Sequence, residues 1–374
     1  MQRKFRKDAF VWYLVDAMTV MQPKMRRRVI KDALRVGLCG IGRAGLNMAR
    51  DHLTVLPQFK IVAGFDILQD RARQLASLCG CDVHTSFQQL LADPRIELVI
   101  IATRSNEHLP MTLEALRAGK DVLVEKPMAL DVAGADAMIA AARKLGRRLF
   151  VRHNRRFDVP FQTALQVLKS GKIGKLFAVQ LRQGGYQHRA DWQTLKKFGG
   201  GQLLNWGPHL IDWALQLVGP KAIDVWADLK RIAAAGDAED HVKLMIRGQS
   251  GIVADIEISG GAAISQPPWL LLGDRGAFMI DSQHQCRLRY FDPRKVRRLK
   301  ASDATPQGRT DPISGLRGEI PWVEEVWTIT PAKSPAFWVE LYKSIRRGTP
   351  FPITLAQARE TMRVISMAKK QTDC

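Results

Sequence analysis

Residues 34–45 read Leu-Arg-Val-Gly-Leu-Cys-Gly-Ile-Gly-Arg-Ala-Gly, and this stretch decides the fold of the first part of the chain. An apolar run ends at Cys39, and three glycines follow in the spacing Gly-x-Gly-x-x-Gly. Between a strand and a helix, such a turn lets the backbone approach a pyrophosphate, which accepts hydrogen bonds from N–H groups at the helix start. The alternative is an ordinary turn, because glycines occur in many turns. The context favours a dinucleotide site made of Gly40, Ile41, Gly42, Arg43, Ala44 and Gly45.

Asp66 ends the next apolar run, 21 residues after Gly45. A carboxylate at this place accepts hydrogen bonds from the adenosine ribose hydroxyls, and it repels a 2′-phosphate, so NAD is favoured over NADP. Two observations keep other interpretations open. Asp66 could instead cap a helix that begins near Leu68, and the cations Arg71 and Arg73, which follow closely, leave NADP as the second candidate cofactor.

Short apolar stretches alternate with helix-period stretches between residues 33 and 155. The apolar stretches predict strands at Arg35–Cys39, Lys60–Phe65, Leu98–Ala102, Asp121–Val124 and Arg148–Val151. The stretches between them predict helices at Ala44–Leu53, Gln69–Leu78, His108–Ala118 and Val132–Leu145. Strands that alternate with helices form βαβ units, so residues 33–155 are predicted to form a Rossmann domain, a doubly wound parallel sheet.

The pattern changes after residue 155, where strands with alternating polarity replace fully apolar ones. We expect a helix at Pro160–Ser170, strands at His241–Arg247 and Gly251–Ile258, a hairpin of Trp269–Leu272 and Ala277–Ile280 turning at 273–276, a long loop at Arg297–Arg317 and a final helix at Leu355–Lys369. Residues 156–374 are therefore predicted to form an α+β domain with a large, mostly antiparallel open sheet. Helices would cover one face and leave the other for oligomerisation.

The composition excludes several classes of protein. A chain of 374 residues with 46% hydrophobic and 25% charged residues is typical of two globular domains, and no apolar run is long enough to span a membrane. Residues 1–35 carry +7 of the net charge of +21, and the remaining +14 is spread over the other 339 residues. We interpret residues 1–32 as a basic N-terminal extension rather than a signal peptide, with a later translation start as the alternative. We predict no nucleic-acid partner, because no basic stripe interleaved with aromatic residues occurs. The five cysteines lack the spacing of metal or redox pairs, so no metal site is predicted and a cytoplasmic location is expected.

Glu125-Lys126-Pro127 comes directly after a predicted strand. Residues at the carboxyl ends of parallel strands face the ligand crevice, so Lys126 is predicted to be a cation at the cofactor site. Pro127 keeps Lys126 out of the helical conformation. The alternative is a surface lysine before a loop.

With these motifs the chain resembles the glucose–fructose oxidoreductase/inositol dehydrogenase family, often written Gfo/Idh/MocA. The resemblance covers residues 34–370 and rests on Gly40–Gly45, on Thr103 with Asn106 and His108, on 118–127, on Asn154–Phe157, on Gly199–Gly201 leading to His209 and Asp212, and on Phe351–Thr354. It implies an NAD(P)-dependent oxidoreductase of sugars, cyclitols or related polyols, commonly a homodimer or homotetramer. Two alternatives on the same scaffold are an NAD-dependent glycosidase and a non-catalytic nucleotide-sensing protein.

The resemblance also implies roles for individual residues. Lys126 would hydrogen-bond the reacting hydroxyl and His209 would be the general base, a task that suits imidazole because its pKa lies near the working pH. Asn205 is the third candidate catalytic residue. Further cofactor contacts are expected from Thr103, Asn106, His108, Glu125, Lys126 and Arg155, and substrate contacts from Lys126, Arg156, Tyr186, Asn205 and His209. The alternative for His209 is a packing histidine on the apolar face of a helix.

Two positions depart from the family pattern. Many members have Asp where this chain has Asn205, which puts the usual Lys–Asp–His arrangement in doubt. Arg104 stands where many members have Pro, and this extra cation would favour an acidic substrate. The loop Gly184–Trp192, which contains Tyr186, is predicted to select the substrate, with an ordinary surface loop as the alternative.

Overall fold

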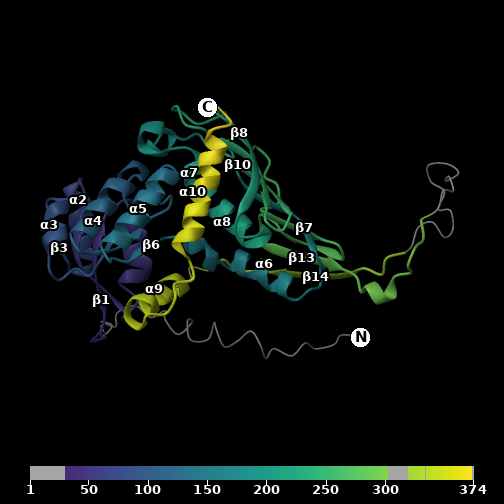
Figure 1. Ribbon diagram of the computed structural model, residues 1–374, viewed down its shortest axis with the longest axis horizontal. Helices are drawn as coiled ribbons and strands as arrows, with labels where there is room; N and C mark the ends of the chain where they lie inside the picture. The colour runs from purple at the N-terminus through teal and green to yellow at the C-terminus, as the bar shows by residue number, and fades with distance from the viewer. Residues whose placement is uncertain (1–29, 302–318, 333, 373–374) are drawn as a thin grey trace.

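The computed structural model describes residues 30–301, 319–332 and 334–372, and it contains two sheets (Figure 1). The first sheet consists of β1 (Leu34–Cys39), β2 (Phe59–Phe65), β3 (Asp82–Val83), β4 (Leu98–Ile101), β5 (Asp121–Val124) and β6 (Leu149–Val151). The strand order is β3-β2-β1-β4-β5-β6 and every neighbouring pair is parallel. The predicted Rossmann fold is confirmed. Its strand order reverses beside β1, and in folds of this topology ligands bind at such a point, outside the carboxyl ends of the strands.

Five α-helices connect these strands: α1 (Arg43–Met48), α2 (Gln69–Cys79), α3 (Phe87–Ala92), α4 (His108–Arg117) and α5 (Val132–Lys144). The predicted first helix is only partly α-helical, because a π-helical segment, Ala49–Leu53, continues α1. The sequence patterns missed β3 and α3. β3 has two residues that are not buried, so it lacks the apolar run that marks the other strands.

The second sheet consists of β7 (Leu176–Gly184), β8 (Ala222–Lys230), β9 (His241–Gly248), β10 (Val253–Ser259), β11 (Trp269–Gly273), β12 (Gly276–Ile280), β13 (Gln285–Tyr290) and β14 (Val323–Thr328). The strand order is β14-β13-β12-β11-β7-β10-β9-β8, and within the described part of this second sheet only β7 and β10 pair in parallel. This confirms the predicted mostly antiparallel sheet and the hairpin at 273–276. Of the predicted loop Arg297–Arg317, residues 302–317 lie outside the described residues, and 297–301 form neither helix nor strand.

Helices cover one face of this sheet: α6 (Val159–Lys169), α7 (Gln202–Asn205), α8 (Gly207–Val218) and α10 (Leu355–Lys369). Figure 1 shows α10, in yellow, between the two domains, and it packs on α5 of the first domain and on α8 of the second. The opposite face is mixed: it exposes the apolar side chains of Trp226 and Val326, and it carries an ion-pair network in which Lys243 contacts Asp255 at 2.9 Å and Glu257 at 3.1 Å. No helix in the described ranges is long and apolar enough to cross a membrane.

The helix α9 (Ala336–Arg347) returns to the first domain. Its aromatic residue Trp338 is buried in the same hydrophobic cluster as Leu34 and packs edge-on against Phe59, with 5.7 Å between ring centroids. Arg346 on the same helix contacts Glu97 at 2.9 Å and Asp32 at 3.1 Å. Residues of α9, which lie far from the first domain in the sequence, thus complete the hydrophobic core of that domain. The boundaries drawn at 32 and 155 remain predictions, and residues 1–29 of the N-terminal extension lie outside the described residues.

Candidate active site

The glycine-rich turn between β1 and α1 has the shape that a dinucleotide requires. Gly40 has φ +83°, and a Cβ there would lie 2.6 Å from the Ala102 carbonyl, while a Cβ on Gly45 would lie 2.0 Å from the Gly40 oxygen. A Cβ on Gly42 would instead project into open space, with Arg71 Nη1 the nearest neighbour at 4.0 Å. Gly42 also caps α1 without a side chain, which leaves the first helical N–H groups to a ligand. The turn fits a pyrophosphate.

Asp66 is buried and holds this turn in place. Its Oδ2 accepts from the Ile41 N–H at 2.7 Å, and its Oδ1 accepts from the Leu68 N–H at 2.9 Å. The N-cap of α2 is Leu68 and has no side-chain hydrogen bond, so Asp66 bonds the chain just before the helix and does not cap it, contrary to the alternative considered above. Each carboxylate oxygen keeps a second lone pair, so the contact to ribose hydroxyls stays a prediction.

Lys126 lies at the carboxyl end of β5, where its Nζ donates to the backbone oxygen of Asn205 at 2.9 Å. Burial lowers its pKa to about 8, since desolvation and the cations Arg155 and Arg152 outweigh the neighbouring Glu125. Glu125 accepts from Arg152 Nη1 at 2.5 Å, and the charge of that guanidinium helps to hold the pKa of the buried carboxyl below its usual value. A lysine with this pKa keeps most of its charge at neutral pH yet can lose its proton.

His209 lies near Lys126, and the two residues with Asn205 form the group that is called the Lys126 cluster below. α7 ends at Asn205 and α8 starts at Gly207, so the chain remains nearly helical from Asn205 to His209. The His209 ring is buried, and its Nδ1 has no hydrogen-bond partner among the described residues. Burial first, and then the charge of Lys126, hold its pKa well below the usual value. The imidazole is therefore neutral at physiological pH and can accept a proton.

Three residues beside the Lys126 cluster were not predicted as site residues from the sequence. His153 follows β6, is buried and has an unpartnered Nδ1 within the described part of the chain, and burial lowers its pKa. Arg152 pairs with Glu125, as above. Gln193 donates from Nε2 to Asn205 Oδ1 at 3.2 Å. His153 and Arg152 follow a predicted strand, and this position at its carboxyl end could have marked them as site residues. Gln193 lies in a short 3₁₀ turn, and no sequence pattern indicates a role for it.

Other predicted cofactor residues line the same edge of the first sheet. His108 is buried, with Nδ1 2.7 Å from the Pro127 oxygen and Nε2 3.3 Å from the Thr103 oxygen, so it braces two loops. The buried Asn106 Oδ1 has no partner in the described ranges. Arg155 stacks over the Trp206 ring at 4.4 Å.

Two predicted substrate residues do not join the cluster. Arg156 is buried, pairs with both oxygens of Asp212 at 2.5 and 2.7 Å, and also donates to Pro352 and Gln357. Tyr186 is 57% exposed, and its ring packs on His188. The structure therefore brings together Lys126, Asn205 and His209. Nearly all the N–H groups of the Arg156 guanidinium donate to residues of the fold, so few remain for a substrate. Arg104 stacks on Phe198 at 4.1 Å, so its charge is held at that ring.

The chain was compared with known proteins. Residues 34–153 match the model of the Gfo/Idh/MocA oxidoreductase family with an NAD-binding Rossmann fold, and residues 161–279 match the C-terminal domain model of that family. The scyllo-inositol 2-dehydrogenase (NADP⁺) IolW of Bacillus subtilis is 26% identical over 93% of this chain and 96% of its own length.

Solved structures share the fold. An NAD-binding protein from Listeria innocua superposes with a TM-score of 0.78 at 23% identity, over 91% of this chain and 98% of its own. GenD2 from gentamicin A biosynthesis, solved in complex with NAD, superposes with a TM-score of 0.72 at 23% identity, over 94% and 97%. Because the two family models together span more than half of the sequence, the chain belongs to the Gfo/Idh/MocA family and is an NAD(P)-dependent oxidoreductase.

Proposed function

We propose that the protein transfers hydride between a C–OH group of a sugar, cyclitol or related polyol and the nicotinamide of its cofactor. The observation that carries this proposal is the half-buried Lys126 at the carboxyl edge of the first sheet, together with the buried His209 whose pKa its charge helps to lower. The inositol dehydrogenase activity named for IolW supports the substrate class.

The pair suits proton removal from a hydroxyl. A nicotinamide cofactor held at the glycine-rich turn Gly40–Gly45 would supply the hydride acceptor for the carbinol carbon. As the C–H bond breaks, the O–H proton passes to neutral His209, and the C–O bond becomes a carbonyl. The Lys126 ammonium, held by the Asn205 carbonyl oxygen, donates to the substrate oxygen and stabilises the negative charge that develops there. The reverse direction uses the same groups with the proton returned.

We further propose NAD as the preferred cofactor, with Asp66 accepting from the ribose hydroxyls. Arg71 lies near Gly42 and is the residue that would admit the 2′-phosphate of NADP. A cytoplasmic homodimer or homotetramer, joined through the open face of the second sheet, completes the proposal.

One screen tests the proposed reaction. The purified protein is assayed for nicotinamide reduction with NAD and with NADP against a panel of sugars and cyclitols. Lys126→Met should lower turnover by about 10²-fold or more while nucleotide binding persists, because the charge opposite the alkoxide is lost. Lys144→Met, on the exposed part of α5, is the matched control.

The alternatives give other results. A glycosidase on this scaffold would release a leaving group without net NADH, and a sensor would bind nucleotide and turn over nothing. Full activity of Lys126→Met would remove this lysine from the mechanism.

A further inference from the structure

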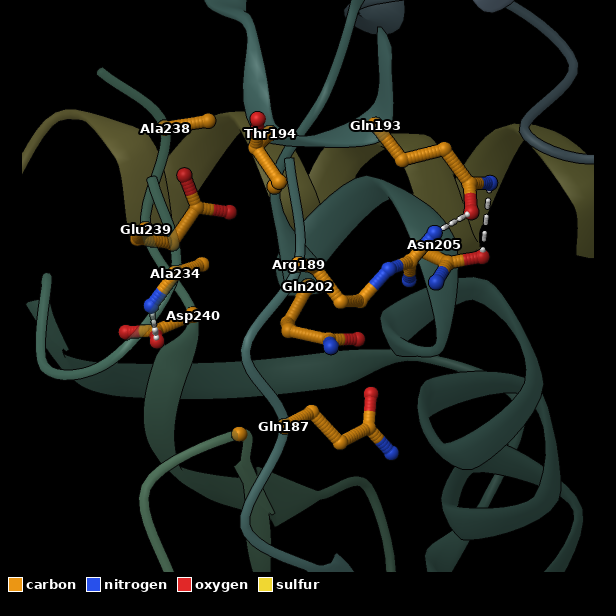
Figure 2. Close-up of a pocket in the computed structure, with 12 residues that line it drawn as sticks. Gln187, Arg189, Gln193, Thr194, Gln202, Asn205, Ala234, Ala238, Glu239 and Asp240 are labelled. Atoms are coloured by element: carbon orange, nitrogen blue, oxygen red, sulfur yellow. Dashed lines mark hydrogen bonds between the residues drawn. The ribbon is translucent and has the colours of Figure 1, made fainter. Parts of the chain in front are cut away.

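A pocket beside Lys126 is lined mainly by amide and charged side chains. Figure 2 shows Gln187, Arg189, Gln193, Gln202 and Asn205 around it, with Glu239 and Asp240 along another wall. Asn205 belongs both to this pocket and to the Lys126 contact. The polarity of the Asn205 side chain therefore bears on which substrate group can lie next to the reacting carbon.

A row of hydrogen bonds sets that polarity. The Arg189 guanidinium can only donate, and its Nη2 lies 2.5 Å from Gln193 Oε1. The other end of the Gln193 amide is then a donor, and its Nε2 donates to Asn205 Oδ1 at 3.2 Å (Figure 2). A flipped Gln193 would point N–H groups at a guanidinium, so the order is determined by chemistry.

Asn205 consequently presents its NH₂ group away from Gln193. This nitrogen has no hydrogen-bond partner among the residues that the structure describes. Arg189 donates from Nη2 to Asp191 and Gln193, and no described residue accepts a hydrogen bond from its Nη1 or Nε. The pocket thus offers amide and guanidinium donors at a position where a carboxylate on residue 205 would have offered an acceptor.

The carboxylates that line the pocket, Glu239 and Asp240, and the neighbouring Asp191 are already engaged. Asp191 pairs with Arg189 at 2.6 Å. Asp240 accepts from the N–H groups of Ile232, Ala233 and Ala234. Glu239 accepts from the Leu203 N–H at 3.0 Å, and its burial raises the pKa of the carboxyl, which favours the neutral form. With Lys126 adjacent, the side of the pocket that faces the reacting carbon is rich in donors.

We propose that the substrate carries a carboxylate, as a sugar acid or carboxylated cyclitol does, and that Asn205 and Arg189 are the specificity-determining residues that bind it. This inference rests on the proposed function, because it places the carboxylate beside a hydroxyl that reacts at Lys126. A carboxylate is an acceptor-only group and forms short charge-assisted hydrogen bonds with amide and guanidinium donors.

Ligand binding to the protein saturated with NADH tests the inference without turnover. The rise in melting temperature and the Kd are measured for matched pairs: glucuronate and glucose, galacturonate and galactose, gluconate and sorbitol, shikimate and its methyl ester. Glucose 6-phosphate is included as a different anion. At least one acid should bind more tightly than its neutral partner and than the phosphate.

Two variants locate the effect. Asn205→Asp places an acceptor against the carboxylate and should weaken binding of that acid by roughly tenfold to a hundredfold, with NADH affinity unchanged. Arg189→Met should also weaken acid binding, and Arg143→Met, which removes an exposed guanidinium on α5, is the control. If Asn205→Asp does not fold, the ligand panel with the wild-type protein and the binding of the acid to Arg189→Met still test the carboxylate proposal.

The outcomes separate this inference from the proposed function. If no acid binds more tightly than its neutral partner, the carboxylate proposal is wrong, even where a neutral polyol is oxidised. The same holds if the phosphate binds best or if Asn205→Asp binds the acid as well as the wild type does. If an acid binds in the expected order but no nicotinamide is reduced, the carboxylate site stands and the dehydrogenase proposal fails.

Discussion

The titration of Lys126 gives a quantitative prediction for catalysis. Its pKa of about 8 lies well below the ordinary 10.5, mainly because the amine is desolvated. An ammonium loses its charge as the pH rises through its pKa, so kcat/KM for substrate oxidation should be level below pH 8 and fall at higher pH. The charged fraction is about one half at pH 8 and about one tenth at pH 9, so the fall is roughly tenfold per pH unit. It should level off at about a 10²-fold loss, the contribution expected of one charge opposite an alkoxide.

The assay is the initial rate of nicotinamide reduction at limiting substrate between pH 6 and pH 10.5, with stability of the enzyme checked at each pH. Glu125→Gln removes the nearest anion that raises the pKa of Lys126, so the fall should begin at a lower pH. Lys126→Arg replaces the amine by a group that stays charged, and any activity that remains should show no fall in this range. A flat wild-type profile up to pH 10, or a fall that Glu125→Gln leaves in place, would refute the reasoning.

Three further predictions concern the cofactor, the pH dependence of stability and the core. Asp66→Ser should narrow or reverse the preference for NADH over NADPH in a fluorescence titration, and tighter NADPH binding by the unmodified protein would contradict the NAD assignment. The buried histidines His108, His153 and His209 all have lowered pKa values, so the unfolded chain binds protons that the folded one does not. Stability is therefore retained above pH 6.5 and lost as the pH falls below it, by about 1.4 kcal/mol per pH unit for each histidine, which denaturant titrations at several pH values would measure. Trp338→Ala should cost about 3–5 kcal/mol of unfolding free energy and lower the melting temperature of the first domain, whereas a loss below 1 kcal/mol would show that α9 contributes little to its core.

Much of the fold could be predicted because many of its strands are either fully apolar, as β4 is, or alternate between buried and less buried residues, as β9 does. The strand Asp121–Val124 and the helix Leu355–Lys369 were predicted with their observed bounds. The helix α9 was not predicted, although its apolar residues Phe337, Trp338, Leu341, Tyr342 and Ile345 lie on one face. The sequence also does not show which distant surface this face covers. β8 and β14 are edge strands whose sides are partly exposed, so their patterns are weak.

The candidate site was predictable to the extent that residues follow a strand or a glycine-rich turn. Lys126 and Asp66 belong to that class, and topology alone brings them to one edge. The contact of Lys126 with the Asn205 backbone and the donation from Gln193 depend on how two domains pack, which a single sequence does not reveal. Arg156 has the residue type of an anion-binding group, yet its partner Asp212 is 56 positions away, and only the fold shows that it is already used.

The return of α9 to the first domain has a consequence for biosynthesis. The surface formed by Leu34 and Phe59 is covered by residues 336–347, which are synthesised after all the strands of both sheets. Domains generally fold in the order of synthesis. Here the nucleotide-binding half keeps an uncovered apolar patch until residues 336–347 have emerged. A nascent chain halted before Phe337 should therefore be protease-sensitive and prone to capture by chaperones, although all six strands of its first sheet are already present.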